Sequence, residues 1–235
     1  IKKLLSYHNG LLLVTGPVGA GKTTTLAALV NELNKNRKDH IITVQDPVEI
    51  VQESIGCNVT QRQVGEHTAS FHSALKGALR EDPDIMAIGE LRDLETIEMA
   101  ISASETGHLV IGTMHTSDAS TTLNRLLDVF PPAQQTQIRT SVAESLRGVL
   151  CQRLLPRTDG GLVLACEILT SNPAVAALIR EGKMQGLRNV METGVKDGMC
   201  VMENSVMDLW RAGTISAETA RQNVSTKQVL AQITG

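Results

Sequence analysis

The chain has 235 residues, 42% of them hydrophobic, which is enough to bury a sizeable core as one large α/β domain or as a domain with an appendage. Its formal net charge is -3, and acidic and basic residues are interspersed, which argues against an electrostatic surface for nucleic acid. The aromatic residues are Tyr7, Phe71, Phe130 and Trp210, so few platforms exist for stacking bases. We therefore expect a soluble globular protein that does not bind nucleic acid.

The four cysteines are scattered and form no C-x-x-C pair, which disfavours a zinc knuckle and a disulfide framework and favours a reduced, cytosolic protein. No apolar stretch approaches the roughly 20 residues needed to span a bilayer, and no signal-peptide pattern opens the chain. Any membrane contact is therefore expected to be peripheral. The chain begins with Ile1 and its first strand follows almost at once, which suggests an upstream domain that this sequence lacks.

The first 130 residues alternate short apolar runs with segments of helical periodicity, a pattern typical of a parallel sheet with crossover helices. Strands are expected at 11–15, 41–45, 85–88 and 109–114. A first helix is expected from about Lys22, where apolar residues fall at helical spacing. Further helices are expected at about 71–79 and around 97–101.

Beyond Pro131 and Pro132 the pattern changes. A long amphipathic helix is predicted at 134–150, followed by a pair of strands at 152–155 and 162–168 around the turn sequence RTDGG. From Pro173 onward the segments are short and helical, including 205–211 and, after a Ser216 cap, 217–223. We therefore expect an α/β core at 1–133, with 134–235 completing that core to about residue 170 and then forming a small helical subdomain.

The stretch GPVGAGKTTT, residues 16–25, matches the phosphate-binding pattern G-x-x-x-x-G-K-[ST]. Its glycines let successive N–H groups point at phosphate oxygens, and the following helix adds its positive end. Lys22 is expected to neutralise the β- and γ-phosphates of a bound nucleotide, and Thr23 to coordinate Mg²⁺. A strand before and a helix after disfavour a chance match. The predicted nucleotide contacts are Gly16, Pro17, Val18, Gly19, Ala20, Gly21, Lys22, Thr23 and Thr24.

Three candidate catalytic residues follow predicted strands, and ligands of parallel sheets bind at the carboxyl ends of the strands. Glu90 is suited to hold Mg²⁺ directly or through water, Glu49 to orient or deprotonate the attacking water, and His115 to sense the γ-phosphate. An acid after a strand is also often a helix cap, and a histidine often has only a structural partner. Both alternatives stay open at this point.

Other polar residues are weaker candidates. Asp84 and His108 precede their strands and are expected at the opposite edge of the sheet. Four arginines are most simply solvated or ion-paired, although an arginine that reaches a neighbouring subunit's nucleotide would accelerate hydrolysis strongly. The sequence does not choose among them: Arg62, Arg80, Arg92 and Arg125.

Four segments in this order, GPVGAGKTTTLAAL, TVQDPVEI, ALREDPDIMAIGELRDLET and TGHLVIGTMHTSDA, resemble the secretion ATPase superfamily, most closely its type IV pilus retraction (twitching motility, PilT-like) branch. The resemblance covers essentially the whole chain. It implies a RecA-like P-loop NTPase core in a homohexamer, ATP and Mg²⁺ as ligands, a general base at Glu49 and histidine-box roles for His108 and His115. It also implies a cytoplasmic location at the inner membrane, action on a membrane platform protein, and an N-terminal PAS-like domain that this sequence lacks.

Two departures from the retraction branch keep other interpretations open. Ala176 and Ala177 stand where the branch typically has arginine and asparagine in A-I-R-N-L-I-R-E, and Gln45 stands where an acid is common. The alternatives to a retraction motor are a pilus assembly or type II/IV secretion ATPase, a nucleotide-binding accessory or regulatory partner of another pilus motor, and, more remotely, a nucleic-acid translocase. The missing paired C-x-x-C insertion favours retraction over assembly.

Overall fold

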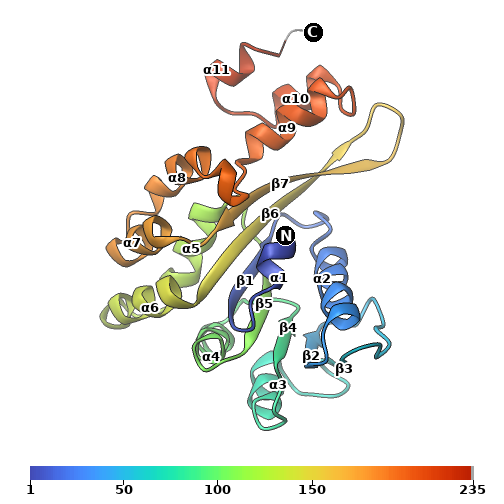
Figure 1. Ribbon diagram of the computed structural model, residues 1–235, viewed down its shortest axis with the longest axis vertical. Coiled ribbons are helices and arrows are strands. Elements are labelled where there is room, and N and C mark those ends of the chain that lie inside the picture. The colour runs from blue at the N-terminus through green and yellow to red at the C-terminus, as the bar shows by residue number, and fades with distance from the viewer. Residues whose placement is uncertain (234–235) are drawn as a thin grey trace.

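The computed structural model describes residues 1–233 and contains one seven-stranded sheet (Figure 1). The strand order is β3-β2-β4-β5-β1-β6-β7, and neighbouring strands are parallel except for the β6–β7 hairpin. The expected mainly parallel α/β sheet is therefore confirmed. The strands are β1 (Gly10–Thr15), β2 (His40–Gln45), β3 (Asn58–Gln63), β4 (Ile85–Ile88), β5 (Leu109–Met114), β6 (Leu146–Pro156) and β7 (Leu162–Thr170).

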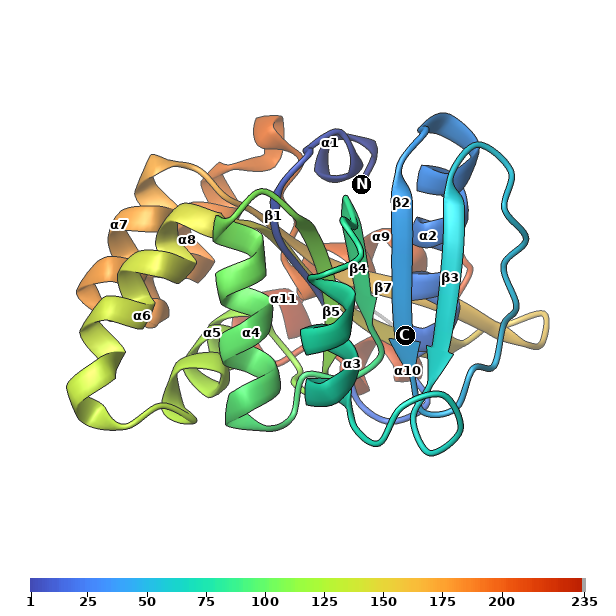
Figure 2. The ribbon, with the colours of Figure 1, turned by 90° about the horizontal axis from the view of Figure 1, so that it is seen from below.

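Helices cover both faces of the sheet, and two apolar clusters hold them there (Figure 2). The cluster on one face joins α1 and α2 to the sheet, and the larger cluster on the other face gathers α3 to α8. Burial on both faces explains why β1, β4 and β5 are continuous apolar runs. The helices are α1 (Lys2–Leu5), α2 (Lys22–Asn36), α3 (Phe71–Ala78), α4 (Leu94–Glu105), α5 (Ala119–Asp128), α6 (Pro132–Ser145), α7 (Pro173–Glu181), α8 (Leu187–Thr193), α9 (Met202–Arg211), α10 (Ala217–Gln222) and α11 (Lys227–Leu230).

The prediction of one helix from 134 to 150 is wrong. Helix α6 ends at Ser145, and residues 146–150 begin β6, which lies beside β1 with Leu13 opposite Val149 and Val14 opposite Leu150. The apolar residues Leu146, Val149 and Leu150 fit a helical stripe as well as a buried strand, because periodicity alone does not separate the two for short apolar runs. Residues 146–150 form a strand because they pair with the central strand β1.

Elements of the structure that are absent from the predicted set include β3 and α5, besides the short α1. Strand β3 has the polar sequence NVTQRQ and lies at the edge of the sheet, where a half-exposed strand needs little apolar content. Helix α5 has Leu123, Leu126 and Leu127 on its buried side and Asp118 as its cap, with the Asp118 carboxylate accepting from the Thr121 amide at 2.8 Å. A capping residue such as Asp118, followed by leucines at helical spacing, is a sequence pattern that predicts a helix.

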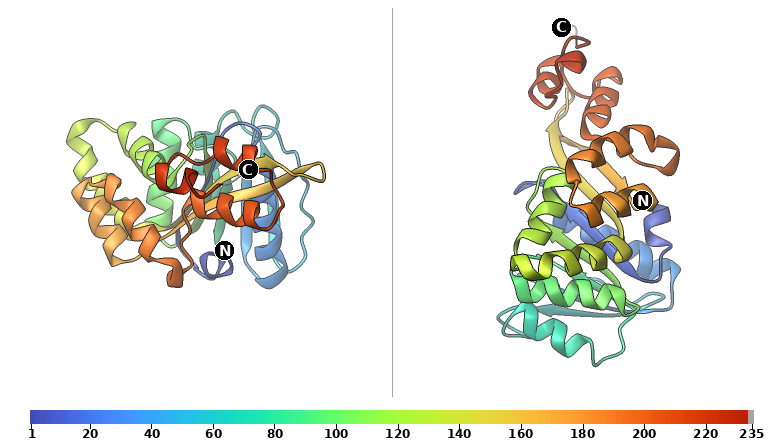
Figure 3. Two further views of the ribbon diagram at one scale, coloured as in Figure 1. Left: turned by 90° about the horizontal axis from the view of Figure 1, so that it is seen from above. Right: turned by 90° about the vertical axis from the view of Figure 1, so that its left-hand side faces the viewer.

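Helices α9, α10 and α11 pack on the end of the β6–β7 hairpin and not on the other five strands of the sheet (Figure 3). Their apolar cluster includes Leu155 and Ala165 from the hairpin, Val206 of α9 and Ala220 of α10, and Ile215 from the connection between these two helices. The expected Ser216 cap is present, since its side chain accepts from the Thr219 amide at 3.1 Å. None of the helices within the described residues 1–233 is long and apolar enough to cross a bilayer.

Glu203, at the start of α9, holds the segment that follows α10 to the rest of this helical group. Its carboxylate accepts hydrogen bonds from the backbone amides of Ser225 and Thr226, each at 3.0 Å, and forms an ion pair with Arg188 of α8. Burial by itself would raise the pKa of Glu203, but the bonds from Arg188, Thr226 and Ser225 outweigh it and lower the pKa to about 2.

We expect Glu203→Gln to destabilise the protein by about 3 kcal/mol at neutral pH. A carboxyl group whose pKa is lowered by folding contributes stability above its unfolded pKa, and loses that contribution as the pH falls through its folded pKa. The difference in free energy of unfolding between wild type and variant should therefore shrink by about half or more between pH 7 and pH 3, as measured by urea denaturation. Glu192→Gln, which removes an exposed partner of the same Arg188, is the control and should cost little.

Candidate nucleotide-binding site

Residues 16–21 form a tight loop between β1 and α2, and neighbouring backbone sets its shape. A side chain at Gly16 would lie 2.5 Å from the Gln152 carbonyl oxygen, so a residue without Cβ is required there. Gly21 caps α2 with a left-handed backbone, φ 81°, which glycine adopts without strain. The loop therefore brings the N-terminal end of α2 to the carboxyl edge of the sheet, where backbone amides favour an anion.

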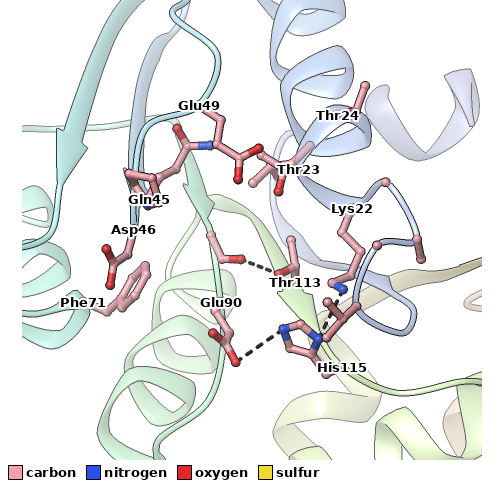
Figure 4. Close-up of a pocket in the computed structure, with 17 residues that line it drawn as sticks. Lys22, Thr23, Thr24, Gln45, Asp46, Glu49, Phe71, Glu90, Thr113 and His115 are labelled. Carbon is pink, nitrogen blue, oxygen red and sulfur yellow. Dashed lines mark hydrogen bonds and ion pairs between the residues drawn. The ribbon is translucent and has the colours of Figure 1, made fainter.

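Lys22 is 9% exposed, and its ammonium group is turned back into the loop (Figure 4). Nζ donates to the carbonyl oxygens of Gly16 at 2.9 Å and Pro17 at 2.8 Å, and it lies 3.3 Å from Nδ1 of His115. These contacts use the three donors of an ammonium group. Burial lowers the pKa of Lys22, and the negative charge of Glu90 opposes that shift by a smaller amount.

His115 lies between Lys22 and Glu90 and connects the loop to the end of β4. Its Nε2 is 3.6 Å from Oε1 of Glu90, and both side chains are partly exposed to the pocket (Figure 4). Because an ammonium group has no acceptor, Nδ1 of His115 must accept from Lys22, which places the ring proton on Nε2 toward Glu90. The three side chains thus form one chain of polar contacts across the ends of β1, β4 and β5.

Glu90 is placed by a short turn that is tied to both neighbouring strands. The Gly89 amide donates to the Val44 carbonyl of β2 at 2.7 Å, and the Leu91 amide donates to the Thr113 carbonyl of β5 at 2.8 Å. The Thr113 hydroxyl also donates to the Gly89 carbonyl. These bonds fix the backbone on both sides of Glu90, whose side chain lines the cavity at the sheet edge.

Glu49 enters from the loop after β2 and is exposed. Two glutamines of the edge strand β3 hold this loop: Gln63 Oε1 accepts from the Val48 amide at 3.0 Å, and Gln61 Oε1 accepts from the Gln52 amide at 2.6 Å. Gln45, at the end of β2, is 5% exposed, and its side-chain oxygen has no hydrogen-bond partner among the described residues. A group that can donate to Gln45 is therefore expected in the pocket.

These side chains line one cavity of about 490 Å³ at the carboxyl edge of the sheet. The structure brings the predicted catalytic residues to it together with most of the predicted loop. Gly16 and Pro17, at the start of the loop, are predicted nucleotide contacts that are not among the lining residues; their carbonyls accept from Lys22. The lining comprises Val18, Gly19, Ala20, Gly21, Lys22, Thr23, Thr24, Leu26, Gln45, Asp46, Pro47, Glu49, Phe71, Gly89, Glu90, Thr113 and His115.

Several other predicted positions lie away from this cavity. The Asp84 carboxylate accepts from the His40 amide at the start of β2, and His108 Nδ1 lies 3.0 Å from the Ala103 carbonyl, both at the opposite edge of the sheet. Arg62 forms an ion pair with Glu81 and Arg80 is exposed. Arg92 and Arg125 line a small cavity beside His115 and Glu90, which makes them the nearest of the four candidate arginines to the main site.

Sequence reasoning missed residues that act on the loop from a distance in the chain. Gln152 of β6 donates from Nε2 to the Ala20 carbonyl at 2.7 Å and is 1% exposed. Thr113 and Gln63 similarly fix the segments that carry Glu90 and Glu49. No motif marks such residues, because their effect depends on which strands become neighbours.

The donor set of the cavity fits magnesium. Mg²⁺ prefers oxygen ligands and usually keeps several waters while binding to one or two carboxylates and to substrate phosphates. The Thr23 hydroxyl and the Glu90 carboxylate supply such oxygens on the same cavity. Within residues 1–233, no cluster of three or more His, Cys, Asp or Glu side chains could hold a metal ion by itself.

The fold and the loop together define a P-loop nucleotide-binding protein with a mainly parallel sheet. Residues 1–234 match the family described as type II/IV secretion system protein, and the chain belongs to this family. A crystal structure of the pilus retraction motor PilT with bound ADP superposes with a TM-score of 0.91 at 44% identity, over 98% of this chain and 65% of that one.

The curated relatives also include proteins named for twitching motility and pilus retraction. The chain is 46% identical to the twitching motility protein of Neisseria gonorrhoeae over 97% of its length, and 46% identical to the type IV pilus retraction ATPase PilT of Pseudomonas aeruginosa over 94%. The type IV pilus ATPase PilU of the same Pseudomonas strain is 38% identical. The chain spans less than two thirds of these proteins, 61% of the first and 64% of the second.

Proposed function

We propose that this chain is the ATP-hydrolysing part of a hexameric motor that powers retraction of type IV pili through an inner-membrane platform protein. The observation that carries the proposal is the convergence of Lys22, Glu49, Glu90 and His115 on the cavity beside the phosphate-binding loop. The proposed location is the cytoplasmic face of the inner membrane, and a paralogous pilus ATPase is a further candidate partner. No role for nucleic acid is proposed.

Each side chain has a proposed part in hydrolysis. Backbone amides of residues 16–24 bind the phosphates, and Lys22 leaves its carbonyl contacts to offset their negative charge. Thr23 and Glu90 hold Mg²⁺, which neutralises charge on the phosphate oxygens. Glu49 orients the attacking water and accepts its proton, and His115 moves with the occupancy of the γ-phosphate position because it contacts Lys22 and Glu90.

The extent of the similarities favours retraction over assembly or secretion. Relatives named for twitching motility or retraction align over 94% to 97% of this chain. The type II secretion protein E of Xanthomonas campestris and the pilus assembly ATPase PilB of Pseudomonas aeruginosa align over 67% and 63%. An assembly or secretion motor is therefore the second candidate.

An accessory role is the candidate of another class, and it rests on Gln45, Ala176 and Ala177. The structure keeps helix α7 despite its two alanines, with Val175 and Ile179 buried and Asn172 capping its start at 2.9 Å. Ala176 and Ala177 are half-buried, and Ala176 packs against the main apolar cluster. These positions therefore tolerate alanine without loss of the helix.

The proposal is tested in a strain that lacks the gene, complemented with wild type or with Glu49→Gln. A retraction motor predicts that the null strain loses twitching and carries surplus surface pili, and that wild type but not the variant restores twitching. Bald cells would identify an assembly motor instead. Restoration by the Glu49→Gln variant, provided that a paralogue is present, would identify an accessory role.

A further inference from the structure

We propose that Glu167 couples the γ-phosphate position of the nucleotide site to the C-terminal helical group (α9 to α11), because its carboxylate holds the starts of both α5 and α9. This inference rests on the proposed function, in which His115 moves with the occupancy of the γ-phosphate position. Glu167 is absent from the lining of the nucleotide cavity. It therefore acts as a positioning residue, through the helix that follows His115.

The first step of the coupling is the short connection from His115 to α5. Three residues separate His115 from Ala119, the first residue of the helix. Thr116 is 5% exposed, and its Oγ1 lies 2.6 Å from Oγ1 of Thr122 in the first turn of α5. The Thr122 hydroxyl also donates to the Asp118 carbonyl at 2.7 Å. The connection is thus clamped to the helix at both of its ends, so a displacement of His115 reaches the start of α5.

The second step is the carboxylate of Glu167, which is 6% exposed. Its Oε1 accepts from the Ala119 amide at 2.8 Å, and its Oε2 accepts from the amide of Met202, the first residue of α9, at 3.3 Å. The next residue, Ile168, exchanges two backbone hydrogen bonds with Cys200, at 2.7 and 3.0 Å, which hold the segment before α9 to β7. A buried polar group that loses its partner costs free energy. A shift of one helix start therefore pulls on the other through this side chain.

The third step is the room that the C-terminal helical group has to move. Helices α9 to α11 form an apolar cluster of their own on the end of the hairpin, separate from the two clusters that cover the main sheet (Figure 3). A cavity of about 290 Å³ lies between this group and the connection after His115, with Ser117 and Asp118 on one side and Glu203 and Asn223 on the other. Close-packed side chains would resist a relative displacement, and the cavity permits one.

The test compares two ligands that differ by the γ-phosphate. Hydrogen exchange is measured by mass spectrometry with saturating ADP or the non-hydrolysable ATP analogue AMP-PNP, each with Mg²⁺. In wild type we expect exchange at residues 115–118 and at the start of α9 to differ between the ligands by about 5-fold or more, the lower end of usual couplings between two sites. In Glu167→Gln the difference at 115–118 should remain and the difference at α9 should be lost, because the amide replaces one acceptor oxygen by a donor.

Glu203→Gln is the matched control. The Glu203 carboxylate also accepts from two backbone amides in the C-terminal part of the chain, and within residues 1–233 it makes no hydrogen bond to α5. Its loss loosens the C-terminal helical group and leaves the link to α5 intact, so the difference between the ligands at α9 should persist. Thr122→Val is the second variant, in case thermal unfolding shows that Glu167→Gln does not fold. It removes the hydroxyl clamp, keeps both bonds of Glu167, and should reduce the difference at α9.

Several results would overturn the inference. Equal exchange at the start of α9 with both ligands in wild type would do so without any variant. An undiminished difference in folded Glu167→Gln would assign the coupling to other contacts, and its loss in Glu203→Gln as well would mean that loosening alone explains the effect. If wild type bound neither ligand, or if residues 115–118 did not distinguish them, the proposed function itself would fail, which is a different result from loss of the coupling.

Discussion

Lys22→Ala is expected to lower ATP hydrolysis by about 10³-fold, the size of effect seen when a preorganised charge-stabilising group is removed from an active site. Lys22 is the side chain proposed to offset negative charge on the terminal phosphates, and its Nζ lies 3.3 Å from Nδ1 of His115. The measurement is steady-state phosphate release from wild type and variant at saturating ATP.

Lys35→Ala is the matched control, because Lys35 is an exposed lysine in the last turn of the same helix α2. It should leave hydrolysis within about twofold, as most surface substitutions perturb little. Lys22→Ala also leaves the Gly16 and Pro17 carbonyls without their donor, so thermal unfolding must be recorded for each variant. Hydrolysis that survives in a folded Lys22→Ala variant would contradict the proposed site.

Glu49→Gln is expected to lower kcat by about 10² to 10⁴-fold, the range for loss of a positioned general base. The amide keeps the size of the carboxylate and cannot accept the proton of the attacking water. Because Glu49 belongs to the β2–β3 loop and not to the phosphate-binding loop, ADP affinity should stay close to that of wild type. Single-turnover hydrolysis and nucleotide binding, measured separately, test this split between chemistry and binding.

Glu53→Gln provides the control for charge in the same loop, since Glu53 is exposed and is absent from the cavity lining. Glu53→Gln should change neither kcat nor ADP affinity appreciably. A Glu49→Gln variant with wild-type kcat would move the role of base to another carboxylate of the cavity, with Asp46 and Glu90 the remaining candidates. The outcome therefore discriminates among acids that the geometry brings together.

The side chain of Glu167 joins the start of α5, in the core, to the start of α9, in the C-terminal helical group. Its buried carboxylate accepts from the Ala119 amide at the start of α5, at 2.8 Å, and from the Met202 amide at the start of α9, at 3.3 Å. Burial raises the pKa of Glu167 more than these two bonds lower it. One side chain thus caps a helix that follows His115 and a helix of the C-terminal group.

The sequence by itself determined the parts of this protein that depend on local order. The loop GPVGAGKTTT between an apolar run and a helical stripe indicated a phosphate site, and the strand ends indicated where Glu49, Glu90 and His115 would lie. These inferences need only the rule that parallel strands share a carboxyl edge. The roles of these residues in catalysis remain predictions.

Only the tertiary structure decided the features that depend on which strands are neighbours. Residues 146–150 became β6 instead of a helix because they pair with β1, and the polar edge strand β3 exists because β2 offers it hydrogen bonds. The same pairing brings Gln152 to the Ala20 carbonyl and Leu154 to Gly21. Contacts between residues more than a hundred positions apart have no local periodicity, so the chain reveals them only once the sheet is assembled.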